Sequence, residues 1–312
     1  MNKIRRVNIY FIIIMIIEVI APYFLFPVYE LLGVENIGLM LVLNHIMIFL
    51  VPAAIYLVVT KSPIKETLKL NKIHWKDALI MVAIGALAYP TSIFFSLITS
   101  LFFKNNISEV VGNLMSMPFI LTLLVVAVTP AITEEVTVRG IILNGYQNCS
   151  RYKTALITGL IFGMLHLDGQ QFLYTTVLGF VLGMVVSVTN SIFAGCITHF
   201  TMNGLSLGIQ YLLFDFIESM GMSMQQEAGL AEMGTAALIF SFVFYGIIAI
   251  AGGAAIWSLI KYVERENIKR GVILPEKSRG ENINTQKIFD YTTIAMILVY
   301  SIIMVLTFWI LK

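Results

Sequence analysis

Charged side chains are scarce in this sequence: Asp, Glu, Lys and Arg make up 12% of its 312 residues, and the formal net charge is only +2. So small a net charge, with the basic residues confined to short loops, argues against a nucleic-acid partner. The chain is apolar instead, with 58% hydrophobic residues and a mean hydropathy of +0.88. A soluble domain cannot bury that much apolar surface, so the composition predicts a helical membrane protein.

Cysteine is nearly absent as well. Only Cys149 and Cys196 occur, and neither stands in a CxxC or Cys/His spacing that would build a metal site or a disulfide framework. The sequence also lacks internal repeats, low-complexity tracts and lipidation boxes. Its two longer polar stretches, 61–77 and 262–288, are too short to bury a core. We therefore expect a single integral membrane domain over residues 1–312.

Long apolar runs fill most of the chain. A hydrocarbon core about 30 Å thick needs roughly 20 apolar residues per helical span. The first run resembles a signal peptide at its beginning but continues too long and lacks a cleavage site, so we expect a retained span. We predict an all-α, polytopic transmembrane helix bundle of about 8–9 spans in the cell membrane. The runs lie at about 8–32, 37–59, 78–103, 117–146, 154–167, 170–190, 191–215, 235–260 and 290–311.

The orientation follows from the distribution of Lys and Arg, because cytoplasmic loops retain an excess of them. Basic residues recur in alternate connections, whereas the opposite loops carry glutamates. We predict a cytoplasmic N-terminus and a C-terminus on the other side. The cytoplasmic cations are Lys3, Arg5, Arg6, Lys61, Lys65, Lys69, Lys72, Lys76, Arg151, Lys153, Lys261, Arg265, Lys269, Arg270, Lys277, Arg279 and Lys287, and the opposite glutamates are Glu30, Glu35, Glu218, Glu227 and Glu232. The basic 61–77 segment is further expected to lie as an amphipathic helix on anionic lipid of the cytoplasmic leaflet.

Ionisable residues within spans are costly in lipid and mark functional sites. The segment P-A-I-T-E-E-V-T-V-R-G places Glu135 and Arg139 four residues apart, on one helical face and in the favourable order for an ion pair. Glu134 is rotated about 100° from Glu135 and is left to face elsewhere, which we expect to be the bundle interior. A carboxyl group buried without a cation suits a general base. The alternative is that both glutamates bind an ion or close a helix–helix contact.

Two further groups of polar residues lie in the next apolar runs. His199 and Asn203 stand four apart, so an imidazole and a carboxamide share one helical face and can both donate to a developing oxyanion. His166 ends the fifth run and falls within the hydrocarbon slab. A lone intramembrane His or Asn is more often an interhelical hydrogen-bonding residue, and that alternative stays open. Glu18, His45 and Asp215 belong to no motif, and we expect ordinary roles for them, with an access path as the alternative.

Taken together, these residues resemble the CPBP family of intramembrane proteases, which includes the CAAX prenyl endopeptidase Rce1 and bacterial abortive-infection and bacteriocin-immunity proteins. The resemblance covers a catalytic core of about 117–215, and the remaining residues match only as further spans. The matching motifs, in the family's order, are E-E-x-x-x-R at Glu134, Glu135 and Arg139, F-x-x-x-H at Phe162 and His166, and H-x-x-x-N at His199 and Asn203.

The resemblance implies an intramembrane endopeptidase whose substrate is a membrane-associated peptide or protein. In it, Glu134 assisted by His166 would activate a water, and His199 with Asn203 would stabilise the oxyanion. The glutamate–arginine pair next to the general base would be structural support. The alternative function is a non-proteolytic membrane scaffold or bacteriocin-immunity protein on the same fold. A transporter is disfavoured because the sequence has no repeats.

The involvement of a metal is left open by the sequence. Two histidines and a carboxylate could supply the three protein ligands of a catalytic Zn2+. Against zinc, no H-E-x-x-H helix is present. We favour metal-free glutamate catalysis, with no cofactor and with zinc as the alternative.

Overall fold

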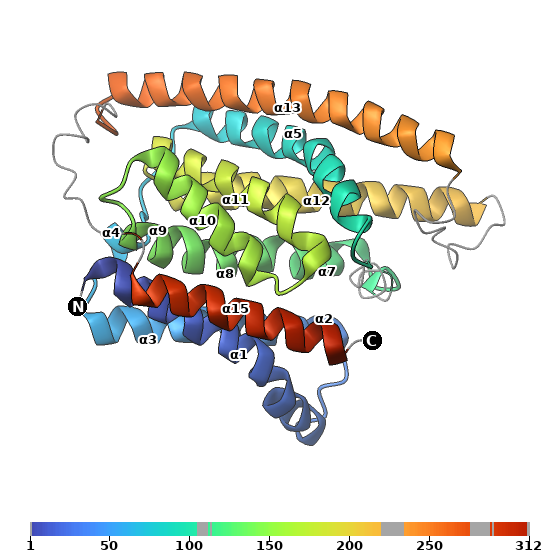
Figure 1. The fold of residues 1–312 in the computed structure, drawn as a ribbon, viewed down its shortest axis with the longest axis horizontal. Helices are drawn as coiled ribbons and strands as arrows, with labels where there is room; N and C mark the ends of the chain where they lie inside the picture. The colour runs from blue at the N-terminus through green and yellow to red at the C-terminus, as the bar shows by residue number, and fades with distance from the viewer. Residues whose placement is uncertain are drawn as a thin grey trace.

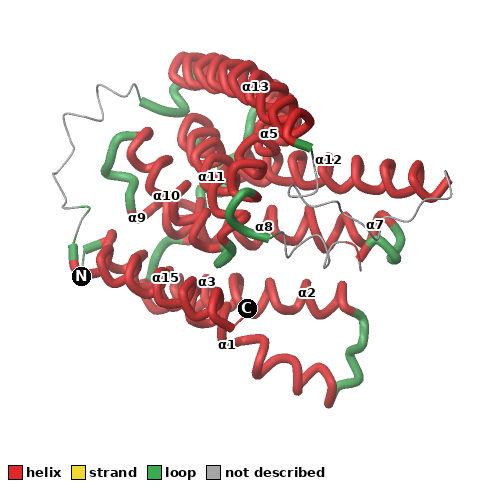
Figure 2. Tube along the Cα trace, turned by 45° about the vertical axis from the view of Figure 1, so that its right-hand side comes forward, coloured by secondary structure: helices red, strands yellow, loops and turns green. Residues whose placement is uncertain are grey.

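The computed structural model describes residues 2–104, 112, 114–219, 234–274, 288 and 290–310, and within these ranges its regular elements are helices, with no strand (Figures 1 and 2). Three segments of π-helix, labelled η, interrupt the longer rods. The principal elements are α1 (Lys3–Leu31), α2 (Ile37–His45), η1 (Ile46–Leu50), α3 (Val51–Thr60), α4 (Ile64–Thr67), α5 (Trp75–Ser100), α7 (Phe119–Leu123), η2 (Leu124–Val128), α8 (Thr129–Glu135), η3 (Val136–Ile142), α9 (Leu143–Gly145), α10 (Arg151–Leu165), α11 (Gly169–Thr189), α12 (Ile192–Ser219), α13 (Thr235–Lys269) and α15 (Tyr291–Ile310).

Seven of the described helices are long and apolar enough to cross a bilayer. Two of these spans are composite: α2, η1 and α3 form one rod over Ile37–Thr60, and α7 to α9 form another over Phe119–Gly145. The 15-residue α10 and the apolar α15 are shorter additions to the same bundle. The chain is a multi-pass integral membrane protein, which confirms the predicted fold class with a span count near the expected one. The cell membrane as its location stays a prediction.

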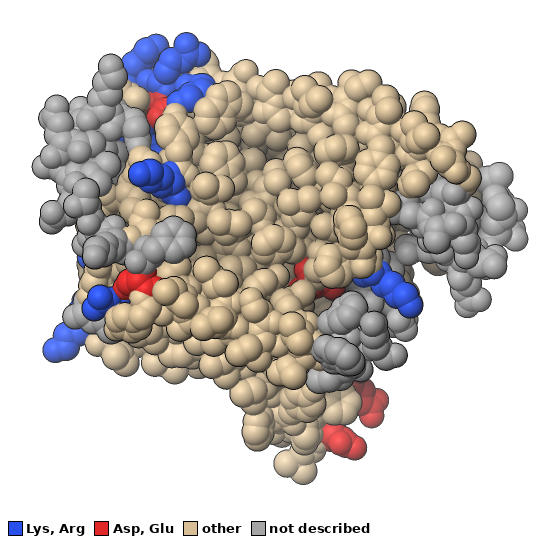
Figure 3. All heavy atoms as spheres, in the orientation of Figure 1, with Lys and Arg blue, Asp and Glu red and all other residues tan. Residues whose placement is uncertain are grey.

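Successive rods run back and forth along the long axis, and the N-terminus lies at one end of the bundle (Figure 1). Most Lys and Arg side chains visible in this view gather at the end where the N-terminus lies (Figure 3). This segregation is the pattern that the positive-inside rule predicts for one membrane face, and the assignment of that face to the cytoplasm stays a prediction. Several of the residues used in that assignment lie outside the described residues: Lys277, Arg279, Lys287, Glu227, Glu232 and the side chain of Glu218.

Proline explains two of the three π-helical segments. Pro52 and Pro130 each lie just after a π-helical segment, η1 and η2 respectively. Because proline has no N–H to donate to the carbonyl four residues before it, the regular hydrogen-bond ladder cannot pass through it. The ladder instead shifts by one residue: the N–H of Val51 bonds to the Ile46 carbonyl and that of Thr129 to the Leu124 carbonyl. Both rods therefore continue across the proline as single spans.

Glycine allows α10 and α11 to pack backbone against backbone. A Cβ atom on Gly159 of α10 would lie 2.7 Å from the Phe180 nitrogen, and one on Gly179 of α11 would lie 2.8 Å from the Gly159 Cα. Gly163 and Gly183 repeat the close approach one turn along each helix. Small residues four apart are the usual means of close helix packing in membranes, where lipid supplies no hydrophobic drive between helices. This contact fixes α10, and with it the end of the helix that carries His166.

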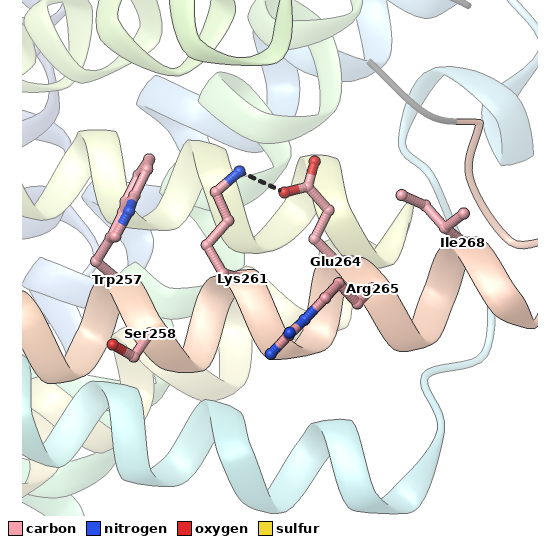
Figure 4. A pocket seen from close by; sticks show the side chains of 6 residues that line it. All are labelled: Trp257, Ser258, Lys261, Glu264, Arg265 and Ile268. Carbon is pink, nitrogen blue, oxygen red and sulfur yellow. Dashed lines mark hydrogen bonds and ion pairs between the residues drawn. The ribbon is translucent and has the colours of Figure 1, made fainter. Parts of the chain in front are cut away.

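Polar contacts join distant helices at the basic end of the bundle. Glu264 of α13 accepts from Arg151 of α10 at 2.8 Å and from Lys261 at 2.7 Å. Lys261 and Glu264 line a surface cavity of about 480 Å³ together with Trp257 and Arg265, where the Lys261–Glu264 bond is visible (Figure 4). This cavity is lined by residues of α13 and by none of the E-E-x-x-x-R segment.

A second tie joins the first and last described helices, which lie side by side in both ribbon views (Figures 1 and 2). Asp290, which precedes α15, accepts a 2.8 Å bond from Arg5 Nε of α1 and a 2.6 Å bond from the hydroxyl of Thr292. Partial burial acts to raise the pKa of Asp290, but the hydrogen bonds from Thr292 and Arg5 outweigh it and hold that pKa below its ordinary value.

The 61–77 segment differs from the expected amphipathic helix, because only the four residues of α4 are helical before α5 begins at Trp75. Lys69 adopts a positive φ of 51°, which a continuing helix would not allow. The segment bonds to the α11–α12 turn instead: the Lys69 carbonyl accepts from the Ile192 N–H at 3.0 Å, and Asn71 donates to the Asn190 carbonyl at 2.8 Å. Tertiary hydrogen bonds have taken the place of helical ones.

Candidate active site

The predicted ion pair between Glu135 and Arg139 is present and fully buried. Arg139 Nη1 donates to Glu135 Oε1 at 2.9 Å, and both side chains have no exposed surface. The same guanidinium donates through Nη2 to the Gly179 carbonyl of α11 at 3.1 Å and lies 4.3 Å from the centre of the Phe162 ring of α10. Arg139 thus ties the E-E-x-x-x-R segment to the two helices that follow it.

His199 of α12 lies between the two adjacent glutamates. Its Nδ1 is 3.1 Å from Glu135 Oε1, and its Nε2 is 4.0 Å from Glu134 Oε2. A carboxylate paired with arginine can only accept a hydrogen bond, so Nδ1 of His199 must carry the proton of the shorter contact. The Nε2 atom of this histidine is consequently the one that faces Glu134.

Glu134 differs from its neighbour in having no arginine partner. Its side chain is 11% exposed, and its Oε2 atom, like that of Glu135, is buried without a hydrogen-bond partner in the described part of the chain. A buried polar oxygen in that state is costly unless the site uses it, because buried carboxylates are normally paired. The two adjacent acids of the motif therefore occupy different environments, one neutralised and one not.

His166 caps the end of α10 and is connected to the other residues through Phe162. Its Nδ1 lies 2.8 Å from the Phe162 carbonyl. A carbonyl only accepts, so Nδ1 carries a proton, and in the neutral ring Nε2 is left as an acceptor. The Phe162 ring centre is 4.9 Å from that of His166 and 5.7 Å from that of His199, edge-on in both cases. The aromatic residue of the F-x-x-x-H motif thus packs between the two histidines and the arginine.

Asn203 is one turn beyond His199 on α12 and is held by a neighbouring helix. Its Nδ2 donates to the Val126 carbonyl at 3.1 Å. That carbonyl is left without its α-helical donor because the residue four positions later is Pro130, which has no N–H. The bond uses one of the two amide protons of Nδ2 and leaves the second. Within the described residues, Asn203 makes no hydrogen bond to the other five predicted site residues.

Two ionisable residues that we expected to have ordinary roles also lie here. His45 of α2 contacts Thr133, the residue before Glu134, with 3.0 Å between Nδ1 and Oγ1, and it is within electrostatic range of His199. Glu18 of α1 is within electrostatic range of Glu134, and its Oε2 is buried with no hydrogen-bond partner in the described ranges. Both stand in spans without a motif, so sequence spacing could not connect them with residues more than eighty positions away.

The side chains of the site are also candidate ligands for a metal ion. Among the residues that the structure describes, no three His, Cys, Asp or Glu side chains form a group that could hold one. Cys196 lies near Glu135 and Arg139 but has no role in the predicted motifs. The chemistry that the arrangement supports with its own side chains is acid–base: an unpaired carboxylate faces a histidine whose other nitrogen is bonded to a second, neutralised carboxylate.

Comparison with known families matches residues 116–205 to the family described as type II CAAX prenyl endopeptidase Rce1-like. The matched segment contains all six predicted site residues and runs from just before α7 into α12, and it confirms the resemblance inferred from the three motifs. An intramembrane protease is the class of protein that this family implies. No curated protein and no solved structure matches the chain.

Proposed function

We propose that this chain is an intramembrane endopeptidase that hydrolyses a peptide bond in a membrane-associated peptide or protein, the class implied by the match over residues 116–205. The observation that carries the proposal is the state of Glu134. Its Oε2 atom is buried, lacks a hydrogen-bond partner in the described chain and lies 4.0 Å from His199 Nε2. A buried carboxylate that forms no ion pair with arginine or lysine can take a proton from a water that enters the site.

In the proposed reaction, a water binds between Glu134 and His166. Its proton passes to the Glu134 carboxylate while its oxygen forms a bond to the scissile carbonyl carbon, and the carbonyl electron pair moves to oxygen. Collapse of this intermediate breaks the C–N bond, and the proton on Glu134 passes to the leaving nitrogen. His166 contributes Nε2 as an acceptor for the second water proton, because its Nδ1 is engaged by the Phe162 carbonyl.

The oxyanion is assigned to His199 and Asn203. His199 Nδ1 already donates to Glu135, so donation to an oxyanion through Nε2 requires a proton on both ring nitrogens. Asn203 contributes the amide proton that Val126 does not use. Donors fixed before the reaction stabilise a developing charge without reorganisation, and loss of one costs on the order of 100- to 1000-fold in kcat.

The test compares Glu134→Gln with wild type in proteoliposomes. Candidate substrates are farnesylated peptides ending in a CAAX sequence and unprenylated membrane-spanning peptides, with the products read by mass spectrometry. We expect cleavage by wild type and a loss of roughly 100-fold or more in the variant, since a general base contributes about 10²–10⁴-fold. Glu30→Gln, at an exposed acid at the end of α1, is the matched control and should keep full activity.

The outcome that overturns the proposal is cleavage by Glu134→Gln at the wild-type rate with the same product. A wild-type protein that cleaves none of these peptides, while both it and Glu134→Gln confer the same bacteriocin resistance on cells, would favour the scaffold or immunity function. In each case, Glu134→Gln must unfold in detergent as the wild type does. A loss of activity then cannot be attributed to a loss of fold.

The proposal is metal-free. Nδ1 of His166 and Nδ1 of His199 are both engaged by protein acceptors, and the roles above use the remaining nitrogens for water and oxyanion. We expect cleavage to survive prolonged chelation and the purified protein to carry no stoichiometric zinc by elemental analysis. Activity that is lost on chelation and restored by added Zn2+ would assign the reaction to a metal site instead.

A further inference from the structure

Three of the four histidines in the chain lie close to one another although they come from three different spans. His166 and His199 belong to the motif-bearing segment, whereas His45 belongs to α2, outside the residues that match the endopeptidase family. His45 is within electrostatic range of both of the others. The fourth, His74, precedes α5, where it caps the first turn and stacks on Trp75.

The hydrogen bond of His45 has a defined direction. Thr133 Oγ1 lies 2.9 Å from the Thr129 carbonyl, to which it donates its single proton, and 3.0 Å from His45 Nδ1. Since the carbonyl can only accept, the hydroxyl proton is used there, and His45 Nδ1 must be the donor to Thr133. Thr133 is 3% exposed, so water does not replace this donor.

The helix that receives this bond, α8, is the middle part of the composite rod Phe119–Gly145. α8 has only seven residues and stands between the π-helical segments η2 and η3. Its rotation about its own axis decides where the Glu134 carboxylate points. Three side chains from other helices hold this region by hydrogen bonds: Asn203 bonds to the Val126 carbonyl just before α8, His45 bonds to Thr133 within it, and His199 bonds to Glu135 at its end.

We propose that His45 is a positioning residue of the site: through its Nδ1–H bond to Thr133 it fixes α8 and so orients the Glu134 carboxylate. This role rests on the proposed endopeptidase function. It also makes the first two spans part of the site, which agrees with the presence of Glu18 of α1 within electrostatic range of Glu134.

Three variants separate this role from the alternatives. Asparagine places an N–H donor where His45 has Nδ1 but has no titratable ring, whereas leucine has neither. We expect His45→Leu to lower kcat by roughly 10- to 100-fold with little change in KM, because small misplacements of a catalytic group cost up to about 10²-fold. His45→Asn should recover most of that loss. Thr133→Val should match His45→Leu, and the double variant should be no worse than either single one. His74→Leu is the matched control and should keep wild-type kinetics.

A measurement that does not depend on enzymatic activity tests the direction of the His45–Thr133 hydrogen bond. In the full chain labelled with ¹⁵N-histidine in detergent, His45 is assigned by its disappearance in His45→Asn. We expect a protonated Nδ1 and an unprotonated Nε2 in wild type, and a shift of the Nδ1 signal in Thr133→Val.

An unprotonated Nδ1 overturns the proposal whatever the kinetics. A second outcome also overturns the proposal: His45→Asn is as inactive as His45→Leu, while Thr133→Val is fully active. In that case His45 would act through its ring and not through Thr133. If wild type cleaves nothing but the histidine signals are as expected, the endopeptidase function fails while the His45–Thr133 contact stands.

Discussion

The buried pair of Glu135 and Arg139 gives the sharpest prediction about stability. Arg139→Met removes the guanidinium and leaves a carboxylate with no exposed surface and no cation. Breaking a buried pair in this way costs about 3–5 kcal/mol of unfolding free energy. The matched control is Lys269→Met, which breaks a pair of nearly equal length, 2.8 Å to Glu266, but with the lysine side chain 71% exposed. Exposed pairs are worth about 0.2–1 kcal/mol.

The expected gap between the two variants is therefore at least about 2 kcal/mol, taking the lower bound for the buried pair and the upper bound for the exposed one. The assay is equilibrium unfolding in mixed detergent micelles, followed by circular dichroism. A third variant, Arg139→Met with Glu135→Gln, removes both charges and should recover part of the loss, because it leaves no uncompensated carboxylate.

Arg139→Met that is no less stable than Lys269→Met would refute the reasoning. It would mean that water reaches Glu135 and that the site is far more polar than its burial implies. A double variant as unstable as Arg139→Met would point to lost packing of the arginine over the Phe162 ring, and not to the unpaired charge.

Three further outcomes are expected from the same unfolding assay. Gly159→Ala should destabilise by about 1–3 kcal/mol, because its Cβ would press on the α11 backbone, whereas Gly253→Ala on α13, with nothing within 4 Å, should be neutral or stabilising by up to about 1 kcal/mol. Asn203→Leu should cost about 1–3 kcal/mol through the unsatisfied Val126 carbonyl, in addition to any loss of activity. The pKa of Asp290 is lower in the folded than in the unfolded protein. Its contribution to stability is therefore present above the unfolded-state pKa and is lost as pH falls through the folded-state pKa. The difference in unfolding free energy between wild type and Asp290→Asn should consequently shrink in acid.

The sequence alone was sufficient for the membrane class, the positions of the rods and the ion pair of the motif. Apolar runs of span length and the four-residue spacing of Glu135 and Arg139 are local features. Such features can be recognised from neighbouring residues in the sequence without knowing the tertiary structure. The different environments of Glu134 and Glu135 could also be anticipated, since a 100° rotation separates adjacent side chains on a helix. The segment 61–77 was the exception, because the Lys69 carbonyl and the Asn71 side chain form hydrogen bonds with residues more than a hundred positions away.

What only the tertiary structure decided is which side chains from different helices meet. His199 could have paired with any buried acid, and its position between Glu134 and Glu135 depends on how α12 packs against α8. His45 and Glu18 carry no motif, and nothing in their spacing connects them with Glu134. Contacts between helices depend on the rotation and crossing of each rod, and these are set by packing over the whole bundle, not by periodicity within one span.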